Sequence, residues 1–75
     1  MGSISLIMAA QWNIYLRELV TGKWYTGIKN GNLNFHPNIR NAIPVGNWND
    51  ADALLETYPQ STPIEAFWIA MPLPQ

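Results

Sequence analysis

The sequence contains no cysteine and only one histidine, His36. Disulfide bonds are therefore excluded, and a closed zinc site, which needs a full set of nitrogen and sulfur ligands, is disfavoured. A chain of 75 residues buries only about 60–65% of the surface that its unfolded form exposes, so its stability margin is small. Because small domains without disulfides or metals gain stability by association, we expect one small domain, residues 1–75, that forms a homo-oligomer or docks on a partner.

Charged residues make up only 12% of the chain, compared with about 25% in typical soluble domains. Aromatic residues are enriched, and lysine and glutamate depleted, where proteins meet. Four tryptophans combined with so few charges therefore favour a surface that another protein covers. The formal net charge is −1, with only four lysine and arginine residues, which disfavours nucleic-acid binding. We expect the partner to be a second copy of the chain or another protein, and infer no small-molecule substrate.

The chain has no long apolar run. Residues 1–10 form an apolar N-terminal segment, but this segment lacks the basic start of a secretory signal and is about half the roughly 20 residues of a membrane-spanning helix. Its first residues, Met-Gly-Ser, are also typical of a cloning remnant. We expect no membrane span and, since cysteine is absent, a cytoplasmic location.

Alternation of apolar and polar residues predicts a hairpin near the start of the chain. Residues 12–17 alternate with the period of two that is typical of a strand, with Trp12 on the apolar side. Residues 24–28 alternate in the same way, and Gly22 between the two runs is free to adopt the positive φ of a turn. We expect Trp12 and Trp24 to form a cross-strand pair in the core.

A second turn follows directly. The dipeptide Asn30-Gly31 is a strong signal for a type I′ turn, in which both central residues have positive φ, so residues 32–35 should form a third strand. Residues 39–45 alternate again and predict a fourth strand. Pro44 cannot donate a ladder hydrogen bond, which places that strand at an edge or ends it early.

One helix is indicated after residue 48. Asn49 is the expected N-cap with Asp52 at N3, and the acidic residues of the first turn suit the positive end of the helix dipole. Pro59 ends the helix. An apolar stripe at the spacing i, i+3, i+4, i+7 consists of Ala51, Leu54, Leu55 and Tyr58.

The last apolar segment, residues 64–71, carries apolar residues on both faces of a strand. Such a strand lies at the centre of a sheet with both faces covered, or is covered from outside the fold. Residues 72–75 form a tail. The chain as a whole predicts the α+β class, with an antiparallel sheet of four to five strands and one helix packed on one face, in the order β-β-β-(β)-α-β.

No catalytic constellation is visible. His36 beside Pro37 reads as a solvated turn histidine, because a general base also needs an orienting partner and a substrate pocket. Asp50 and Asp52 are explained by helix capping, and the glycines lack the strand-to-helix context of a phosphate loop. We expect no enzyme activity, no cofactor and no metal.

Residues 15–27 and 49–55 together resemble small uncharacterised ββα modules encoded by bacteriophages. The shared features are a strand, a hairpin with the sequence Thr-Gly-Lys-aromatic, and a helix that opens with Asp-Ala. The chain departs from these modules in its weakly charged surface. The resemblance implies a viral accessory or virion protein, in the host cytoplasm or the virion, and assigns no functional residues.

Two functions fit these observations best. The first is a non-enzymatic assembly protein, for instance a minor structural component of a phage. Its alternative is a soluble inhibitor or adaptor, of the anti-defence type, that binds a host protein through an exposed aromatic sheet face. A small hydrolase or nuclease is disfavoured. The expected interface consists of Tyr15, Tyr25, Phe67, Ile69 and Met71, with the two tyrosines exposed on one face as anchors.

Overall fold

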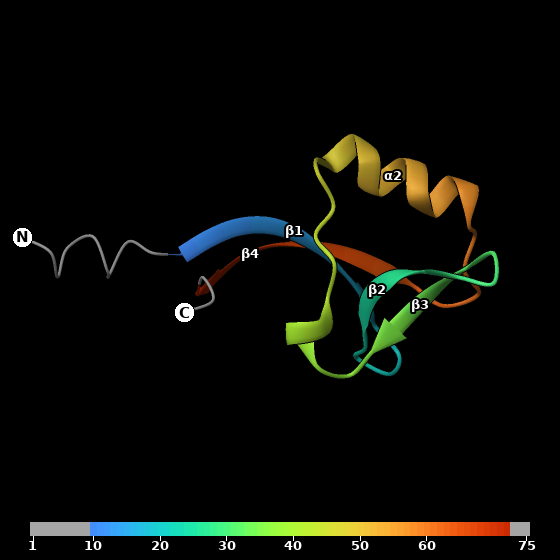
Figure 1. Ribbon diagram of the computed structural model, residues 1–75. Coiled ribbons are helices and arrows are strands. Elements are labelled where there is room, and N and C mark those ends of the chain that lie inside the picture. Colours follow the sequence, from blue (N-terminus) through green and yellow to red (C-terminus); the bar gives the residue numbers. More distant parts are fainter. Residues whose placement is uncertain (1–9, 73–75) are drawn as a thin grey trace, which may run out of the picture.

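The structure, a computed structural model, describes residues 10–72. These residues contain a four-stranded antiparallel sheet in the order β3-β2-β1-β4, with one α-helix on one face (Figure 1). Along the chain the elements are β1 (Ala10–Glu18), β2 (Trp24–Lys29), β3 (Asn32–His36), the 3₁₀ helix η1 (Ile39–Asn41), α2 (Trp48–Thr57) and β4 (Ile64–Pro72). The predicted α+β class is confirmed. Of the predicted N-terminal segment and tail, only Ala10 and Pro72 lie inside the described residues, and both belong to strands.

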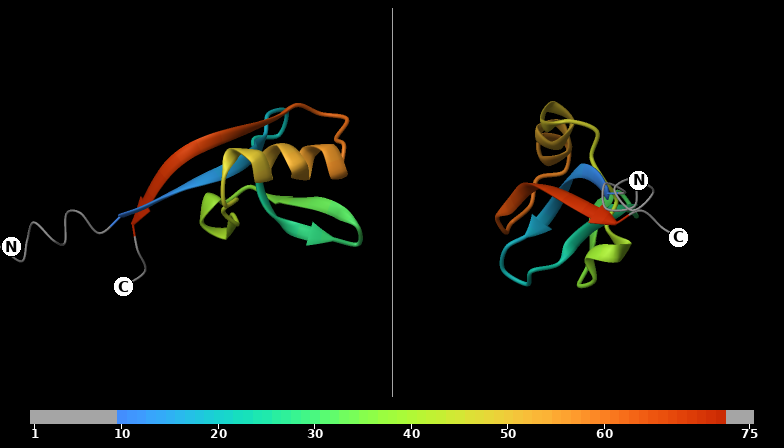
Figure 2. Two further views of the ribbon diagram at one scale, coloured as in Figure 1. Left: turned by 90° about the horizontal axis from the view of Figure 1, so that it is seen from above. Right: turned by 90° about the vertical axis from the view of Figure 1, so that its left-hand side faces the viewer.

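β1 and β4 pair along their whole length, in a register that runs from Ala10↔Pro72 to Glu18↔Ile64. One end of this pair extends beyond α2 as a two-stranded ribbon (Figure 1, Figure 2). We call residues 10–14 and 68–72 the distal ribbon. Its innermost pair, Ile14 and Trp68, adjoins the core, to which Ile14 belongs. Because β1 separates β4 from β2, β4 is an edge strand. Of the two alternatives for this strand, the central position is therefore excluded, and cover from outside the fold stays a prediction.

The optional strand expected over residues 39–45 does not form, so the sheet has four strands, the lower of the two expected numbers. The first part of this segment forms the 3₁₀ helix η1, which the side chain of Asn38 caps by accepting a hydrogen bond from the backbone N–H of Arg40 at 2.9 Å. The next residues cross between β1 and β2, where Val45 forms only an isolated bridge with Ile14. Pro44 explains why no ladder develops there, since it has no N–H to donate.

The hairpin from β2 to β3 follows the prediction at its turn. Asn30 has a φ of 54° and Gly31 a φ of 77°, which are the positive values that a type I′ turn requires. The expected pairing of Trp12 with Trp24 is wrong, because Trp24 lies opposite Arg17 in the register of β1 and β2. Trp24 therefore lies on the same face of the sheet as Arg17, whereas Trp12 lies on the opposite face.

The helix begins earlier than the sequence suggested. The N-cap is Asn47, whose side chain accepts a hydrogen bond from the backbone N–H of Asp50 at 2.8 Å. Asn49 lies inside the first turn, so its prediction as the N-cap is wrong. The helix ends at Thr57, shortly before Pro59.

A hydrophobic core lies between α2 and the sheet. The predicted helical stripe is confirmed, because Ala51 is buried and the other three members pack against the core. Fully burying a side chain such as that of Leu16 stabilises the fold by about 1.5–3 kcal/mol. The buried cluster consists of Ile14, Leu16, Tyr25, Leu33, Val45 and Ala51.

Candidate interaction surface

The two tyrosines expected as exposed anchors are buried. Tyr15 is 5% exposed and Tyr25 is 6% exposed. Tyr25 belongs to the core on the helix side, where its ring meets Phe35 edge-on with 6.4 Å between the centroids. Because the register of β2 directs it to the helix side, the expectation of a tyrosine pair on one open face is wrong.

The face of the sheet opposite α2 is partly covered by the chain itself. η1 lies on that side (Figure 1, Figure 2) and contacts β2. Phe67 is half-buried there and meets Trp24 edge-on, with ring centroids 5.9 Å apart. The guanidinium of Arg17 stacks on the other ring of this pair, 4.9 Å from the centroid of Trp24. Phe67 is thus committed largely to internal contacts.

The remaining expected interface residues are on β4. Ile69 is half-buried, and its contact with a partner stays a prediction. The backbone of Met71 belongs to β4, but its side chain lies outside the described part of the structure.

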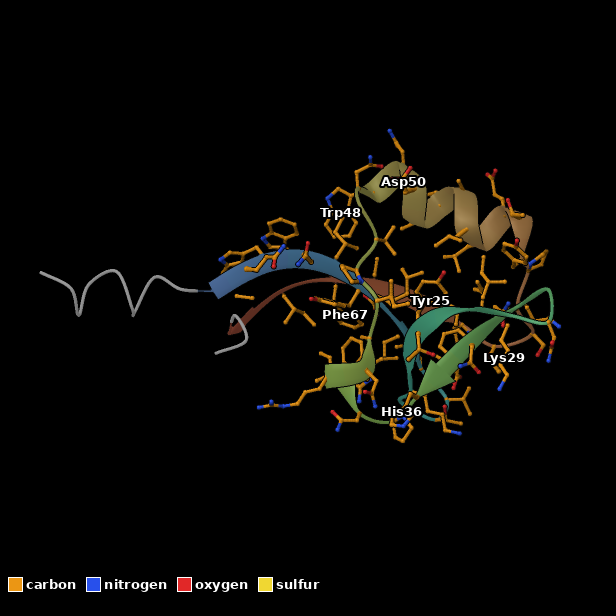
Figure 3. The ribbon with its side chains drawn as sticks, viewed as in Figure 1. Tyr25, Lys29, His36, Trp48, Asp50 and Phe67 are labelled. Atoms are coloured by element: carbon orange, nitrogen blue, oxygen red, sulfur yellow. The ribbon has the colours of Figure 1, made fainter. Side chains whose placement is uncertain are left out.

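The most exposed aromatic residues are tryptophans. Trp12 is 54% exposed, Trp48 52% and Trp68 56%. The rings of Trp12 and Trp68 stack on each other, with centroids 5.8 Å apart and planes inclined by 19°. Trp48 is the first residue of α2 and lies at the end of the helix that faces the distal ribbon (Figure 3). We call these three residues the tryptophan patch.

The register explains how the two ribbon tryptophans meet. Trp12 lies opposite Ala70, and Ile14 lies opposite Trp68, so the tryptophans occupy a diagonal position on the helix side of the ribbon. Diagonal neighbours on antiparallel strands are within reach of aromatic side chains. The small side chain of Ala70 leaves room for the rings, and such a pair contributes about 0.5–1.5 kcal/mol beyond the area it buries.

A signal for this patch is present in the sequence. A helix of 10 residues is about 15 Å long, whereas a strand of nine residues spans about 30 Å. One such helix cannot cover the whole length of the strand pair. Apolar residues near the far ends of β1 and β4, such as Trp12 and Trp68, are therefore left exposed.

The buried carboxylate of Glu18 has a structural role. It accepts hydrogen bonds from the backbone N–H of Val20 at 2.7 Å, from the backbone N–H of Thr21 at 2.9 Å, and from the hydroxyl of Thr21. The hydroxyl of Thr21 is the main cause that lowers the pKa of Glu18, and the two backbone donors add to it against the opposing effect of burial. The carboxylate therefore fixes the loop between β1 and β2. An open hollow of about 370 Å³ lies beside this loop, lined by residues that include Glu18, Lys23 and Leu33.

The other polar candidates are exposed. The Nδ1 atom of His36 accepts a hydrogen bond from the backbone N–H of Asn38 at 3.0 Å, and the side-chain amide of Asn41 lies 3.1 Å from the same atom. His36 is thus exposed, as predicted, but it is the last residue of β3 rather than a turn residue. Asp50 and Asp52 are exposed on the first turns of α2. Residues 10–72 contain no group of three or more potential metal ligands.

No family model matches the chain, and neither do the curated proteins or the solved structures with which it was compared. Within the described range, no helix is long and apolar enough to cross a membrane. The resemblance to phage modules therefore stays a prediction.

Proposed function

We propose that this protein acts without catalysis, as an assembly or accessory protein that binds another protein chain through the tryptophan patch. The observation that carries the proposal is the stacked pair of Trp12 and Trp68, each more than half exposed, on a ribbon that extends beyond the helix. Exposed apolar side chains gathered in one place mark interaction sites. Tryptophan is also enriched among the residues that dominate binding energy.

The low charge of the chain supports a contact that is mainly apolar. The net charge of −1 produces little repulsion between copies and little long-range steering. Salt screens exposed charges but has little effect on buried apolar area. The association should therefore change little between low and high ionic strength.

The alternative function is an inhibitor or adaptor that uses the same patch to bind a host protein. It is favoured by the positions of the three exposed tryptophans, since Trp12 and Trp68 stack on the distal ribbon and Trp48 lies at the end of α2 that faces this ribbon. A phage-encoded role is part of both proposals and rests on the resemblance of the hairpin and the helix start.

Solution mass tests the proposal most directly. We would measure the purified chain by size-exclusion chromatography with light scattering, over a series of protein concentrations at low and high salt. The variant Trp12→Ser/Trp68→Ser removes the stacked pair, while Val20→Ser/Ile28→Ser removes two exposed apolar residues elsewhere. We expect a multimer insensitive to salt that only the tryptophan variant dissociates.

Other results separate the alternatives. A folded monomer at every concentration would favour the inhibitor or adaptor function. Binding to the host protein should then depend on the same two tryptophans. Equal behaviour of both double variants would remove the tryptophan patch from the proposal. A reaction that the wild type catalyses and His36→Ala abolishes would overturn the non-enzymatic function.

A further inference from the structure

β4 presents a free backbone edge. It pairs with β1 on one side, and it is the outermost strand of the sheet in the described residues. An edge strand carries unpaired N–H and C=O groups that are a ready template for another strand. The identity of the residues whose backbone groups face outward can be derived from the hydrogen bonds around β1.

One bond fixes the alternation. The backbone N–H of Leu19 donates to the carbonyl of Pro63 at 3.0 Å, one step beyond the last ladder pair Glu18↔Ile64. Residue pairs in an antiparallel ladder alternate between hydrogen-bonded and non-hydrogen-bonded. The odd-numbered residues of β4 therefore direct their backbone groups toward β1, and the even-numbered residues direct theirs away from it.

A second bond agrees with this assignment. The carbonyl of Ile14 accepts from the backbone N–H of Val45 at 2.8 Å, on the side of β1 away from β4. Ile14 is the register partner of Trp68, so this pair is a non-hydrogen-bonded one. The residues whose N–H and C=O groups face the free edge are Ile64, Ala66, Trp68 and Ala70.

The two edges of the sheet differ in how they are protected. The β3 edge has five residues, of which Asn32, Asn34 and His36 are exposed, and a proline follows it. β4 has nine residues, no lysine, no proline before its last position and no register shift along β1. Short length, proline, lysine and bulges are the devices that keep edges from pairing. β4 lacks all of them except its terminal proline.

We propose that the free edge of β4 pairs antiparallel with β4 of a second copy, in a two-fold arrangement centred on Trp68, to form one continuous sheet of two four-stranded halves. This inference rests on the proposed function and names its partner. The centre at Trp68 uses the full strand, since it places Ala66 opposite Ala70 of the other copy. Both of these residues direct their N–H and C=O groups to the edge.

The occupant is a second copy because the edge is complementary to itself. Glu65 is the one charged residue of β4, and the two-fold register places it opposite Met71 of the other copy rather than opposite its own counterpart. Like charges directly across a strand pair are destabilising, and this register avoids them. The same register brings the two copies of Trp68 together, each already stacked on its own Trp12.

The decisive variant removes a single edge donor. Ala70→Pro deletes an N–H that faces the free edge and leaves the bonds to β1 in place, at a position where an edge strand tolerates proline. Ala70→Val is the matched control, because it keeps the N–H and places a similar apolar bulk beside the Trp12–Trp68 pair, so that the two variants differ in the edge donor. The donor is lost twice in a two-fold dimer. We therefore expect the dimer dissociation constant of Ala70→Pro, measured by sedimentation equilibrium, to be at least about tenfold higher than that of Ala70→Val.

Amide hydrogen exchange measured by NMR on the wild type gives a second test that no substitution can confuse. The amides of Ile64, Ala66, Trp68 and Ala70 should be protected above the dissociation constant and exchange rapidly below it. The amides of Phe67 and Ile69, which face β1, should stay protected at both concentrations.

Each outcome is informative. Equal dissociation constants for the two Ala70 variants, or rapid exchange of the even-numbered amides in a persistent multimer, would overturn edge pairing. If that multimer still dissociates on Trp12→Ser/Trp68→Ser, the proposed function survives without this edge. A wild type that stays monomeric up to millimolar concentration also overturns the self-pairing, and leaves the tryptophan patch to a different protein.

Discussion

Two regions of the strand pair β1–β4 differ in whether their apolar side chains are buried or exposed. Leu16 and Trp12 lie on one face of β1, four positions apart, yet Leu16 is 0% exposed and Trp12 is 54% exposed. Leu16 lies in the part of the molecule where α2 covers the sheet, which we call the body. Trp12 lies on the distal ribbon, beyond the helix (Figure 1). The difference shows that the cover, rather than the strand pattern, decides which residues become core.

The largest effect should follow from a change in the body. Leu16→Ala removes a fully buried side chain from the centre of the core and should lower the free energy of unfolding by about 2–5 kcal/mol. Urea unfolding followed by tryptophan fluorescence would measure the loss. For a chain with a narrow margin, this variant is expected to be partly unfolded. A loss below about 1 kcal/mol would contradict the assignment of Leu16 to a tightly packed core.

A smaller effect tests how the helix that makes the body is started. Asn47→Ala removes the side-chain acceptor of the Asp50 N–H and should cost about 0.5–2 kcal/mol. Asn49→Ala is the matched control, because Asn49 lies inside the first turn, where alanine is the better helix former. We expect Asn49→Ala to be neutral or slightly stabilising in the same urea experiment. The reverse ranking would restore Asn49 as the N-cap.

On the ribbon, stability and association should respond differently. Trp12→Ala removes the stack on Trp68 and should lower the free energy of unfolding by about 0.5–1.5 kcal/mol. The loss is this small because much of the Trp12 ring already faces solvent. The same change should strongly reduce the solution mass if the patch is the contact. A variant that loses about 2 kcal/mol or more with no change in mass would show that Trp12 belongs to the core after all.

The local elements were accessible from the sequence because their causes are local. Asn30 and Gly31 specify a turn by their own φ preferences, and the helical stripe that includes Ala51 follows from a period of 3.6 residues. The faces were not accessible in the same way. A period of two divides a strand into two sets of residues, and a slip of one residue between strands exchanges them. The register of β1 and β2 in the structure differs from the expected one by such a shift, so Tyr25 lies in the core and Trp24 on the opposite face.

The position of β4 was out of reach for a related reason. Its residues are apolar on both faces, so alternation could not indicate whether it lies at the centre or the edge of the sheet. The tryptophan patch needed one further comparison, between the length of the helix and the length of the strands it covers. Both quantities follow from element boundaries, which makes Trp12 and Trp68 the part of the site that sequence reasoning could have found.

The smallest effect concerns pH and separates the two ends of β1. Glu18 anchors the body end through the Val20 and Thr21 donors, and its pKa is lowered in the folded chain from the ordinary value of 4.5. The unfolded state therefore takes up this proton at a higher pH than the folded state does. The stabilisation is fully present above the ordinary pKa and is lost as the pH falls through the lowered one.

Glu18→Gln should remove this acid dependence, because the amide cannot ionise and offers one acceptor where the carboxylate offered two. We expect the variant to be less stable than the wild type at neutral pH, and the difference to shrink as the pH falls below 4.5. Glu56→Gln, on an exposed position of α2, controls for the change in net charge and should keep the wild-type slope. Since no carboxylate takes part in the tryptophan stack, the solution mass should not follow this titration while the chain stays folded. If the solution mass fell together with the Glu18-dependent loss of stability, the body and the distal ribbon would be coupled. Association would then also depend on the end of β1 that carries Glu18.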